Sequence, residues 1–320
     1  MRGVMRRPAA APLALALLLA LVSACSSPVS DAIPPASESH AGAAPAAVAS
    51  PAPSVTSMPA VVPPDATPMA PPAATSLRTA TSPPAPLVAV DPGHGGRDLG
   101  ARHFNARGEM DYHESTVNLD LALLVRDALL RRGFRVLLVR DGDYMLNDFE
   151  EDTNGDGVID TADDLQTRID LINAEDADLL LSIHQNAFYF ASGADSSDVG
   201  GVVTYYCADR PFSEESLRLA RLVQAALVTA FRDDLGHDIE DRGIEVDVAL
   251  GAHLILLGPE SERTARPSEM PGVLSEAMFI THWREGVLAR DPHALQVLAG
   301  AYADAVEQYF AGAEVREDAP

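Results

Sequence analysis

The sequence predicts an α/β fold of three layers, in which a mostly parallel or mixed central sheet carries helices on both faces. After Leu87, short apolar runs alternate with longer segments whose apolar residues recur at helical spacing. The strand-like runs cover 87–90, 134–139, 178–184, 201–207, 252–258 and 273–280, and the helix-like segments cover 115–132, 165–174, 214–231 and 294–310. Strands that alternate with helices in this way are typical of a layered sheet.

Each element has a local signal of its own. The run at 87–90 is wholly apolar, as in a strand that is buried on both faces. Within 115–132, Val117, Leu121 and Leu124 are spaced by three or four residues, and Gly133 is a natural stop for the helix. The later runs follow the same two patterns. We therefore expect one domain over residues 87–312, followed by an acidic tail at 313–320.

The N-terminal residues predict export and a lipid anchor. Basic residues precede an apolar run at 9–22, and small residues lead to Cys25. This segment resembles the bacterial lipobox, which implies that residues 1–25 form a signal peptide and that Cys25 is lipidated. The alternative is an ordinary signal peptide that is cut after Ala24. Residues 26–86 are mostly Ala, Pro, Ser, Thr and Val, a composition that predicts a disordered tether.

Charge and cysteine usage restrict the partners. The net charge is −24, and every basic residue other than histidine is arginine. Such a chain repels nucleic acid and anionic lipid, so we expect no nucleic-acid partner and a membrane contact only through the lipid anchor. With Cys25 lipidated, Cys207 has no partner for a disulfide and is interpreted as a buried strand residue. We expect a monomer in the cell envelope.

Chemistry-bearing residues lie near the ends of the predicted strands. His94 follows the first strand in a glycine-rich loop, His184 ends the third, and Glu276 lies in the last. Glu114 precedes the first helix and is expected at the same edge of the sheet. Two imidazoles and a carboxylate can hold a hydrolytic Zn²⁺ with an open position for water, and a further glutamate can serve as its general base.

These residues stand in four ordered blocks that carry a resemblance. VAVDPGHGGRDLGA, ESTVNLDLALLVRDAL, LLLSIHQNA and MPGVLSEAMF resemble the signature blocks of the zinc-dependent N-acetylmuramoyl-L-alanine amidases of bacterial cell walls. The resemblance implies that His94, Glu114 and His184 are the Zn²⁺ ligands and that Glu276 is the catalytic carboxylate. It also implies that peptidoglycan is the substrate, cleaved between N-acetylmuramic acid and L-alanine.

The last block departs from the family pattern. Family members commonly have a glycine two residues after the glutamate and an asparagine shortly beyond, whereas this chain has Met278 and then Thr281 and His282. The departure bears on substrate fit rather than on catalysis, because Glu276 is kept. His113, next to Glu114, is a competing candidate ligand.

A second pattern predicts a calcium loop inserted at about 142–164. Asp at position 1, glycine at position 6 and an apolar residue at position 8 follow the EF-hand spacing. The predicted calcium ligands are Asp152, Asn154, Asp156, Val158, Asp160 and Asp163. Aspartate in place of glutamate at position 12 resembles the calcium loops of dockerin modules, and the alternative is an acidic, solvated turn. We expect this Ca²⁺ to be structural.

Two other functions are compatible with part of this pattern. A non-catalytic peptidoglycan-binding lipoprotein of the same fold would have no use for both a metal set and a base. A zinc carboxypeptidase also uses two histidines and a glutamate, but its ligands typically include a compact H-x-x-E pair, which this sequence lacks. The sequence therefore favours the amidase.

Overall fold

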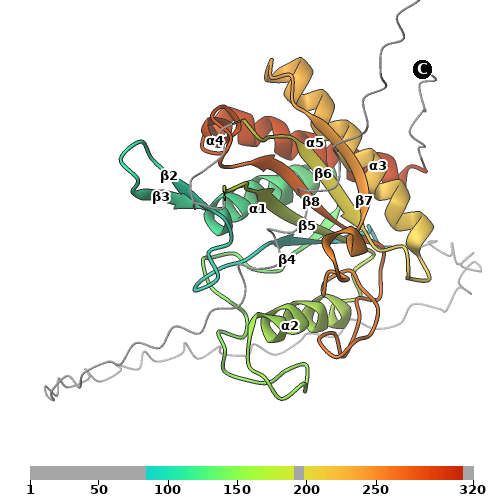
Figure 1. Cartoon of the computed structure of the whole chain (residues 1–320). Helices are drawn as coiled ribbons and strands as arrows, with labels where there is room; N and C mark the ends of the chain where they lie inside the picture. Colours follow the sequence, from blue (N-terminus) through green and yellow to red (C-terminus); the bar gives the residue numbers. More distant parts are fainter. Residues whose placement is uncertain (1–83, 191–197, 313–320) are drawn as a thin grey trace, which may run out of the picture. The chain divides into compact units, whose positions relative to one another are not determined.

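Six strands form one mixed sheet in the order β4–β1–β5–β8–β6–β7 (Figure 1). The computed structural model describes residues 84–190 and 198–312, so the predicted signal peptide, Cys25, most of the tether and the acidic tail lie outside the described residues. The strands are β1 (Leu87–Pro92), β4 (Arg135–Leu138), β5 (Leu179–Asn186), β6 (Val202–Tyr206), β7 (Asp241–Val246) and β8 (Gly272–Phe279). All neighbouring pairs are parallel except β6 and β8, which are antiparallel. The predicted α/β fold with a mixed sheet is confirmed.

Helices cover both faces of the sheet and make three layers (Figure 1). Helices α1 (Glu114–Arg131), α3 (Ser213–Thr229) and α5 (Pro292–Phe310) pack together on one face, and α2 (Thr161–Ala174) lies on the other. The sheet has a hydrophobic core on each face, and alternate residues of β1 pack into one or the other. Val88 and Val90 belong to the core under α1, α3 and α5, whereas Leu87 and Ala89 belong to the core under α2. An apolar run without polar alternation is what a strand covered on both faces requires.

A short β-hairpin directly precedes α1. Strands β2 (Arg102–Phe104) and β3 (Met110–His113) pair in antiparallel fashion outside the main sheet. Helix α1 begins at the residue directly after β3, which places Glu114 at its N-terminus. The sequence analysis did not predict this hairpin, because strands of three and four residues give little periodic signal.

The prediction of a strand over residues 252–258 is wrong, because this segment forms turns. Leu256 and Leu257 are buried, but they pack as part of a loop over the core under α2. The edge of the sheet is formed by β7, in which three of the six residues are charged and none is buried. A short apolar run cannot by itself distinguish a buried loop from a strand.

Two smaller differences concern helix boundaries. Helix α2 begins at Thr161, four residues before its predicted start, because Asp160 and Asp163 form a capping box at its N-terminus. The chain after α3 continues into a π-helical turn at Ala230–Asp234, and a short helix α4 (Glu285–Leu288) follows β8. No helix in the described ranges is long and apolar enough to cross a membrane.

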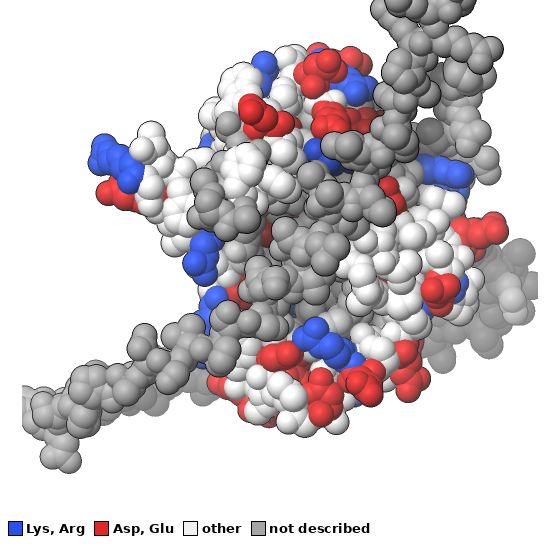
Figure 2. Space-filling model, viewed as in Figure 1, with Lys and Arg blue, Asp and Glu red and all other residues white. Residues whose placement is uncertain are grey.

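The surface carries the negative charge that the composition indicates. Figure 2 shows acidic side chains gathered over the lower part of the molecule, where Figure 1 places α2 and the loop before it. Exposed acids of that loop include Glu150, Glu151, Asp152 and Asp156. This face is therefore suited to cations rather than to anionic polymers.

Candidate active site

The loop after β1 is built so that its backbone can approach two side chains. His94 adopts a left-handed conformation, with φ of 62°. A Cβ atom on Gly93 would lie 2.1 Å from Nε2 of His184, and one on Gly100 would lie 2.4 Å from Oε2 of Glu114. Since real Cβ atoms do not come this close to other heavy atoms, both positions require glycine. The glycine-rich loop thus brings distant segments together.

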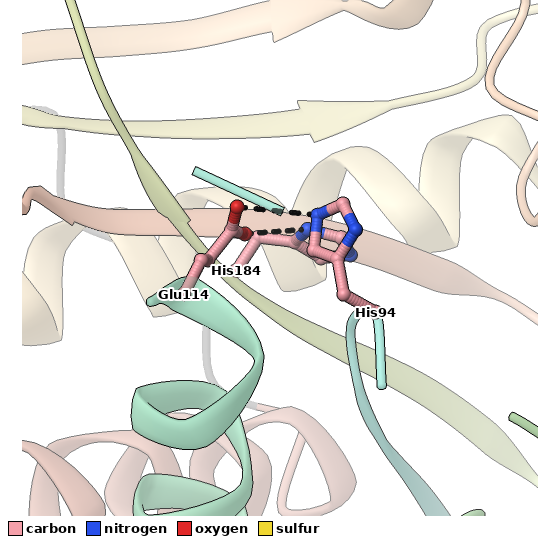
Figure 3. Close-up of side chains that lie close together, drawn as sticks. All are labelled: His94, Glu114 and His184. Atoms are coloured by element: carbon pink, nitrogen blue, oxygen red, sulfur yellow. Dashed lines mark hydrogen bonds and ion pairs between the residues drawn. The ribbon is translucent and has the colours of Figure 1, made fainter. Parts of the chain in front are cut away.

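His94, Glu114 and His184 converge at this edge of the sheet (Figure 3). Nε2 of His94 lies 3.2 Å from Oε2 of Glu114, and Nδ1 of His184 lies 3.0 Å from Oε1 of the same carboxylate. One potential ligand atom from each residue lies within 4.8 Å of the other two. The three side chains come from the loop after β1, the first turn of α1 and β5 (Figure 3). Their arrangement is that of a candidate metal centre.

Hydrogen bonds fix Glu114 and His94 in this arrangement. The carboxylate of Glu114 accepts the backbone N–H groups of Ala101 at 2.8 Å and Gln185 at 3.0 Å. On the far side of the His94 ring, Nδ1 lies 2.8 Å from Oδ2 of Asp98, which leaves Nε2 facing Glu114. A carboxylate on the second ring nitrogen is the usual partner of a metal-binding histidine. The sequence analysis did not identify Asp98, although this residue lies only four positions after His94.

The charges of this group are strongly coupled. Burial opposes protonation of His94, but the charge of Glu114 and the hydrogen bonds of Asp98 and Glu114 outweigh burial and hold the pKa of His94 well above its usual range. Burial likewise opposes ionisation of Glu114, yet the charges and hydrogen bonds of His94 and His184 hold the pKa of Glu114 well below its usual range. The carboxylate is therefore ionised and requires positive charge beside it.

Glu276 lies next to the candidate metal centre on the neighbouring strand. His184 of β5 and Glu276 of β8 are register partners in the parallel pair, so their side chains are on the same face of the sheet. Burial and the charge of Glu114 raise the pKa of Glu276 well above its usual range, partly opposed by His94. Its Oε2 is buried without a hydrogen-bond partner. A buried, unpartnered carboxyl oxygen beside this group makes Glu276 the candidate catalytic carboxylate.

Two buried arginines hold the backbone of the His94 loop. Arg140 donates to the carbonyl oxygens of Pro92 and Gly93, each at 2.9 Å. Arg168 donates to the carbonyl oxygens of Pro92 at 2.9 Å and His94 at 2.6 Å. These residues were not singled out from the sequence, because nothing local distinguishes an arginine that folds inward from one on the surface.

Other residues singled out from the sequence lie elsewhere. His113 contacts Oγ of Ser115 at 2.9 Å and is not part of the His94–Glu114–His184 group. Cys207 is buried, as expected, but it lies just after the end of β6 rather than in the strand, and burial is the main cause that raises the pKa of its thiol to about 11. Such a thiol is not a nucleophile at neutral pH.

The predicted calcium loop does not gather its carboxylates around one point. Among the described residues, none of the groups of convergent His, Cys, Asp and Glu side chains includes a residue of this loop. Asp152 accepts the N–H groups of Gly155 and Gly157, and Asp163 accepts those of Thr153 and Asp160. These oxygens already form hydrogen bonds within the loop, so calcium binding stays a prediction.

The mixed sheet with helices on both faces defines an α/β protein, and the His94–Glu114–His184 group at its edge is a candidate metal centre. Residues 88–308 match the sequence model of a family described as N-acetylmuramoyl-L-alanine amidase, Amidase_3. The chain therefore belongs to the N-acetylmuramoyl-L-alanine amidase family, whose members are peptidoglycan hydrolases.

Individual relatives agree with this assignment. The chain is 28% identical over 224 residues to the germination-specific N-acetylmuramoyl-L-alanine amidase of Bacillus subtilis, covering 70% of this chain and 79% of that protein. It is 26% identical over 249 residues to the amidase AmiA of Escherichia coli, covering 70% and 76%. The crystal structure of an N-acetylmuramoyl-L-alanine amidase from Clostridium difficile 630 superposes with a TM-score of 0.52 at 25% identity, covering 71% of this chain and 97% of that one.

Proposed function

We propose that this protein hydrolyses the amide bond between N-acetylmuramic acid and L-alanine in peptidoglycan. His94, Glu114 and His184 would hold a Zn²⁺ ion, and Glu276 would act as general base and then as general acid. One observation carries the proposal: three side chains from distant segments meet around a single point, and Glu276 on the adjacent strand has one buried carboxyl oxygen without a hydrogen-bond partner.

The donor set fits zinc. Two imidazole nitrogens and one carboxylate are the ligands that a hydrolytic zinc site uses while leaving a position open. One potential ligand atom from each of these three side chains lies within 4.8 Å of the other two, which lets a single ion contact all three. Zinc bound in this way supplies an acidified water and polarises the carbonyl group under attack.

In the proposed reaction, Glu276 transfers the proton. Its carboxylate takes one proton from the attacking water as the new C–O bond forms, and returns it to the nitrogen as the C–N bond breaks. The products are the free lactyl carboxylic acid and the free amino group of L-alanine. Without added positive charge, burial and the charge of Glu114 favour the protonated form of Glu276, and a cation between the three ligands would favour the ionised form.

The experiment is a digestion of purified sacculi with the full chain in the presence of zinc. The expected products are free stem peptides with L-alanine at the N-terminus and glycan strands without peptide, identified by mass spectrometry and end-group labelling. Release of C-terminal amino acids alone would identify a carboxypeptidase. Binding to sacculi without any new amino group would identify a binding protein. Either result would overturn the proposal.

We further propose that the loop containing residues 152–163 binds one structural Ca²⁺. The support is the spacing of its oxygen ligands and the hydrogen bond from the N–H of Gly157, at position 6, to the carboxylate of Asp152, at position 1. Asp163 at position 12 is fully buried and caps α2. Calcium bound there would stiffen the connection that leads into α2.

The location proposed for the protein is the cell envelope. Members of the family act on cell-wall peptidoglycan, which supports export. Lipidation at Cys25 would attach the protein to a membrane, and a long tether over residues 26–86 would let the catalytic domain reach the wall. We propose that the protein acts as a monomer.

A further inference from the structure

A tyrosine on the strand beside Glu276 has a hydroxyl group that makes no hydrogen bond within the fold. Tyr205 lies in β6 and is only 7% exposed. Buried tyrosine hydroxyls usually have a hydrogen-bond partner, but within the part of the chain that the structure describes no group bonds to this one. Its oxygen is not fully enclosed, whereas Oε2 of Glu276 is. The hydroxyl is therefore available to a molecule that binds from solvent.

The register of the sheet places Tyr205 and His184 on opposite sides of Glu276. Val203 of β6 is paired with Glu276 of β8, and Tyr205 follows two residues later, so its side chain is on the same face of the sheet as Glu276. His184 is paired with Glu276 from the other neighbouring strand, β5. The three side chains therefore lie on one face of three adjacent strands, with Glu276 in the middle.

The side chain of Tyr205 is long enough to reach the surroundings of Glu276. Diagonal neighbours in an antiparallel pair are about 7–8 Å apart, a separation that an aromatic side chain can bridge. Among the charges that act on the hydroxyl, that of Glu276 is the strongest, followed by those of Glu245 and Arg242. The ring belongs to the core under α2, as does its register partner Leu274. Packing thus fixes the ring and holds the hydroxyl near the candidate catalytic carboxylate.

The hydroxyl of Tyr205 is a hydrogen-bond donor at any physiological pH. Burial is the largest cause that raises the pKa of Tyr205 above its usual range, and the charges of Glu276 and Glu245 add to it, opposed in part by Arg242. A phenol that stays protonated can donate one hydrogen bond to a carbonyl oxygen.

A second tyrosine near this strand has a purely structural environment. The hydroxyl of Tyr302, in α5, donates to Oγ of Ser275 at 2.9 Å, and its side chain is fully buried. Ser275 directly precedes Glu276 in β8, so its side chain is on the opposite face of the sheet. Tyr302 therefore completes the core under α1, α3 and α5. Tyr205 differs because its hydroxyl lies on the face of the active site and has no described partner.

The order of groups across the sheet indicates which part of a substrate would meet Tyr205. The candidate metal ligands lie on one side of Glu276, and Tyr205 lies on the other. In the proposed reaction, Glu276 returns a proton to the departing nitrogen, so that nitrogen is on the Glu276 side of the carbonyl carbon. The chain that continues beyond the nitrogen, away from the metal ligands, is the peptide.

We propose that Tyr205 is a substrate-binding residue whose hydroxyl donates a hydrogen bond to a carbonyl oxygen of the peptide on the amine side of the scissile bond, an inference that rests on the proposed amidase function. This contact would favour substrates in which a peptide follows the scissile bond. It requires no movement of the ring, because packing already fixes it.

The substitution Tyr205→Phe tests this role because it removes only the hydroxyl group. The protein is the full chain loaded with zinc, and the substrate is a soluble N-acetylmuramoyl peptide with a tripeptide stem. Calorimetry gives the Kd of the intact substrate in the Glu276→Gln background, and steady-state kinetics give KM and kcat with Glu276 present. We expect Kd and KM to rise at least about fivefold, the lower end of the cost of leaving a buried carbonyl without a donor. The value of kcat should stay near that of the parent, as for a contact made equally in the ground state and the transition state.

The matched control is Tyr206→Phe, at the next position of β6. Tyr206 packs against the core under α1, α3 and α5, on the other face of the sheet, so this variant should match the parent in Kd, KM and kcat. Zinc content and the midpoint of urea unfolding should be unchanged in the Tyr205→Phe variant, because the hydroxyl that it loses has no described partner in the fold.

Three results would overturn the inference. A smaller increase in Kd, in a Tyr205→Phe protein that is folded, loaded with zinc and able to cleave, would remove Tyr205 from the binding site and leave the proposed function intact. A fall in kcat at unchanged Kd and KM would assign the hydroxyl to the reacting atoms instead. A parent protein that neither binds nor cleaves the muramoyl peptide would overturn the proposed function, and this inference with it.

Discussion

Glu114 is the residue around which the active site is arranged. Each of its two carboxylate oxygens faces one imidazole, and each also accepts a backbone N–H, from Ala101 or Gln185. A glutamate held on both oxygens cannot rotate away, so the positions of His94 and His184 are set relative to a fixed point. This preorganisation is what a metal-binding site requires.

Replacing Glu276 by glutamine should abolish proton transfer and leave the metal site intact. We expect hydrolysis of sacculi to fall by about 10²- to 10⁴-fold, the range for removing a general acid–base group. Zinc content should stay at the parental level, because Glu276 lies outside the ligand set. Glu245→Gln, on an exposed glutamate of β7, is the matched control and should be fully active. Near-parental activity of the Glu276→Gln variant would contradict the assignment.

Replacing Asp98 by alanine should weaken metal binding without removing a ligand. Asp98 contacts the ring nitrogen of His94 that points away from Glu114, so its loss frees the ring to rotate. Removal of such a partner typically costs about 10- to 100-fold in metal affinity. Competition with a zinc chelator measures this. Asp111→Ala removes a similar contact to His103 at 2.6 Å, away from the site, and should leave zinc affinity unchanged.

The residues singled out from the sequence differ from the supporting residues in how local their signal is. His94, Glu114, His184 and Glu276 stand in recognisable local blocks at strand or helix ends. The supporting residues, Asp98, Arg140 and Arg168, act through contacts to backbone atoms or rings, and most of those partners are distant in the sequence. Such partners are defined only when the chain has folded.

At the scale of secondary structure, one buried ion pair joins α2 to β1. Arg168 and Asp91, each 1% exposed, lie 2.8 Å apart. Arg168 also donates to the carbonyl oxygen of His94, so this pair links helix α2 to the loop that carries His94. Burial opposes ionisation of Asp91, but the charges of Arg168 and His184 and the hydrogen bonds of Arg168 and Ser182 outweigh it, so the pKa of Asp91 is lowered.

This pair predicts a specific dependence of stability on pH. A carboxyl whose folded-state pKa is lowered stabilises the fold above its unfolded-state pKa, and the contribution is lost as the pH falls through the folded-state pKa, below about 4. Asp91→Asn should lower the free energy of unfolding at neutral pH by about 3 kcal/mol, the low end of the range for breaking a buried pair, because Arg168 stays buried with Asp164 as its remaining counter-charge. Urea unfolding measures both effects. Asp170→Asn, which breaks a more exposed ion pair with Arg266, should lower the free energy of unfolding by less than about 1 kcal/mol.

The loop that precedes α2 predicts a response to calcium. If the loop binds Ca²⁺, calcium at about 100 times its Kd should raise the free energy of unfolding of the zinc-loaded protein by about 2.7 kcal/mol. Asp152→Ala/Asp156→Ala should remove the response. Glu150→Ala/Glu151→Ala changes the same number of acids in the same loop outside the ligand set and should keep it. Identical melting curves with and without calcium would rule out the site.

The sequence analysis succeeded for long periodic elements and failed for short ones. Helices α1, α3 and α5 and the inner strands were predicted because each presents a regular apolar pattern to a large core. The segment 252–258 has the composition of a strand, yet the N–H of Leu254 bonds to Asp247 and the segment turns back over the sheet. The edge strand β7, largely polar and half-exposed, gave a weak signal because it buries little apolar surface.

At the scale of the whole molecule, attachment to a membrane is the main prediction. Cys25→Ser should move the protein from the membrane fraction to the soluble fraction of the envelope, because the cysteine thiol is the only position at which the lipobox predicts acylation. The mass of the mature protein should fall by that of the attached acyl groups. Cys207→Ala changes the other cysteine and should remain with the membrane. A membrane-bound Cys25→Ser protein would contradict lipidation.

The sequence by itself determined the fold class and the order of the main elements, and it singled out the four residues proposed for the site. It could do so because apolar periodicity and glycine-rich strand ends are local properties of the chain. Only the tertiary structure decided which side chains lie close together. The support given to the His94 loop by Arg140 and Arg168 depends on how strands and helices far apart in the sequence are brought together. Local patterns do not encode these distances.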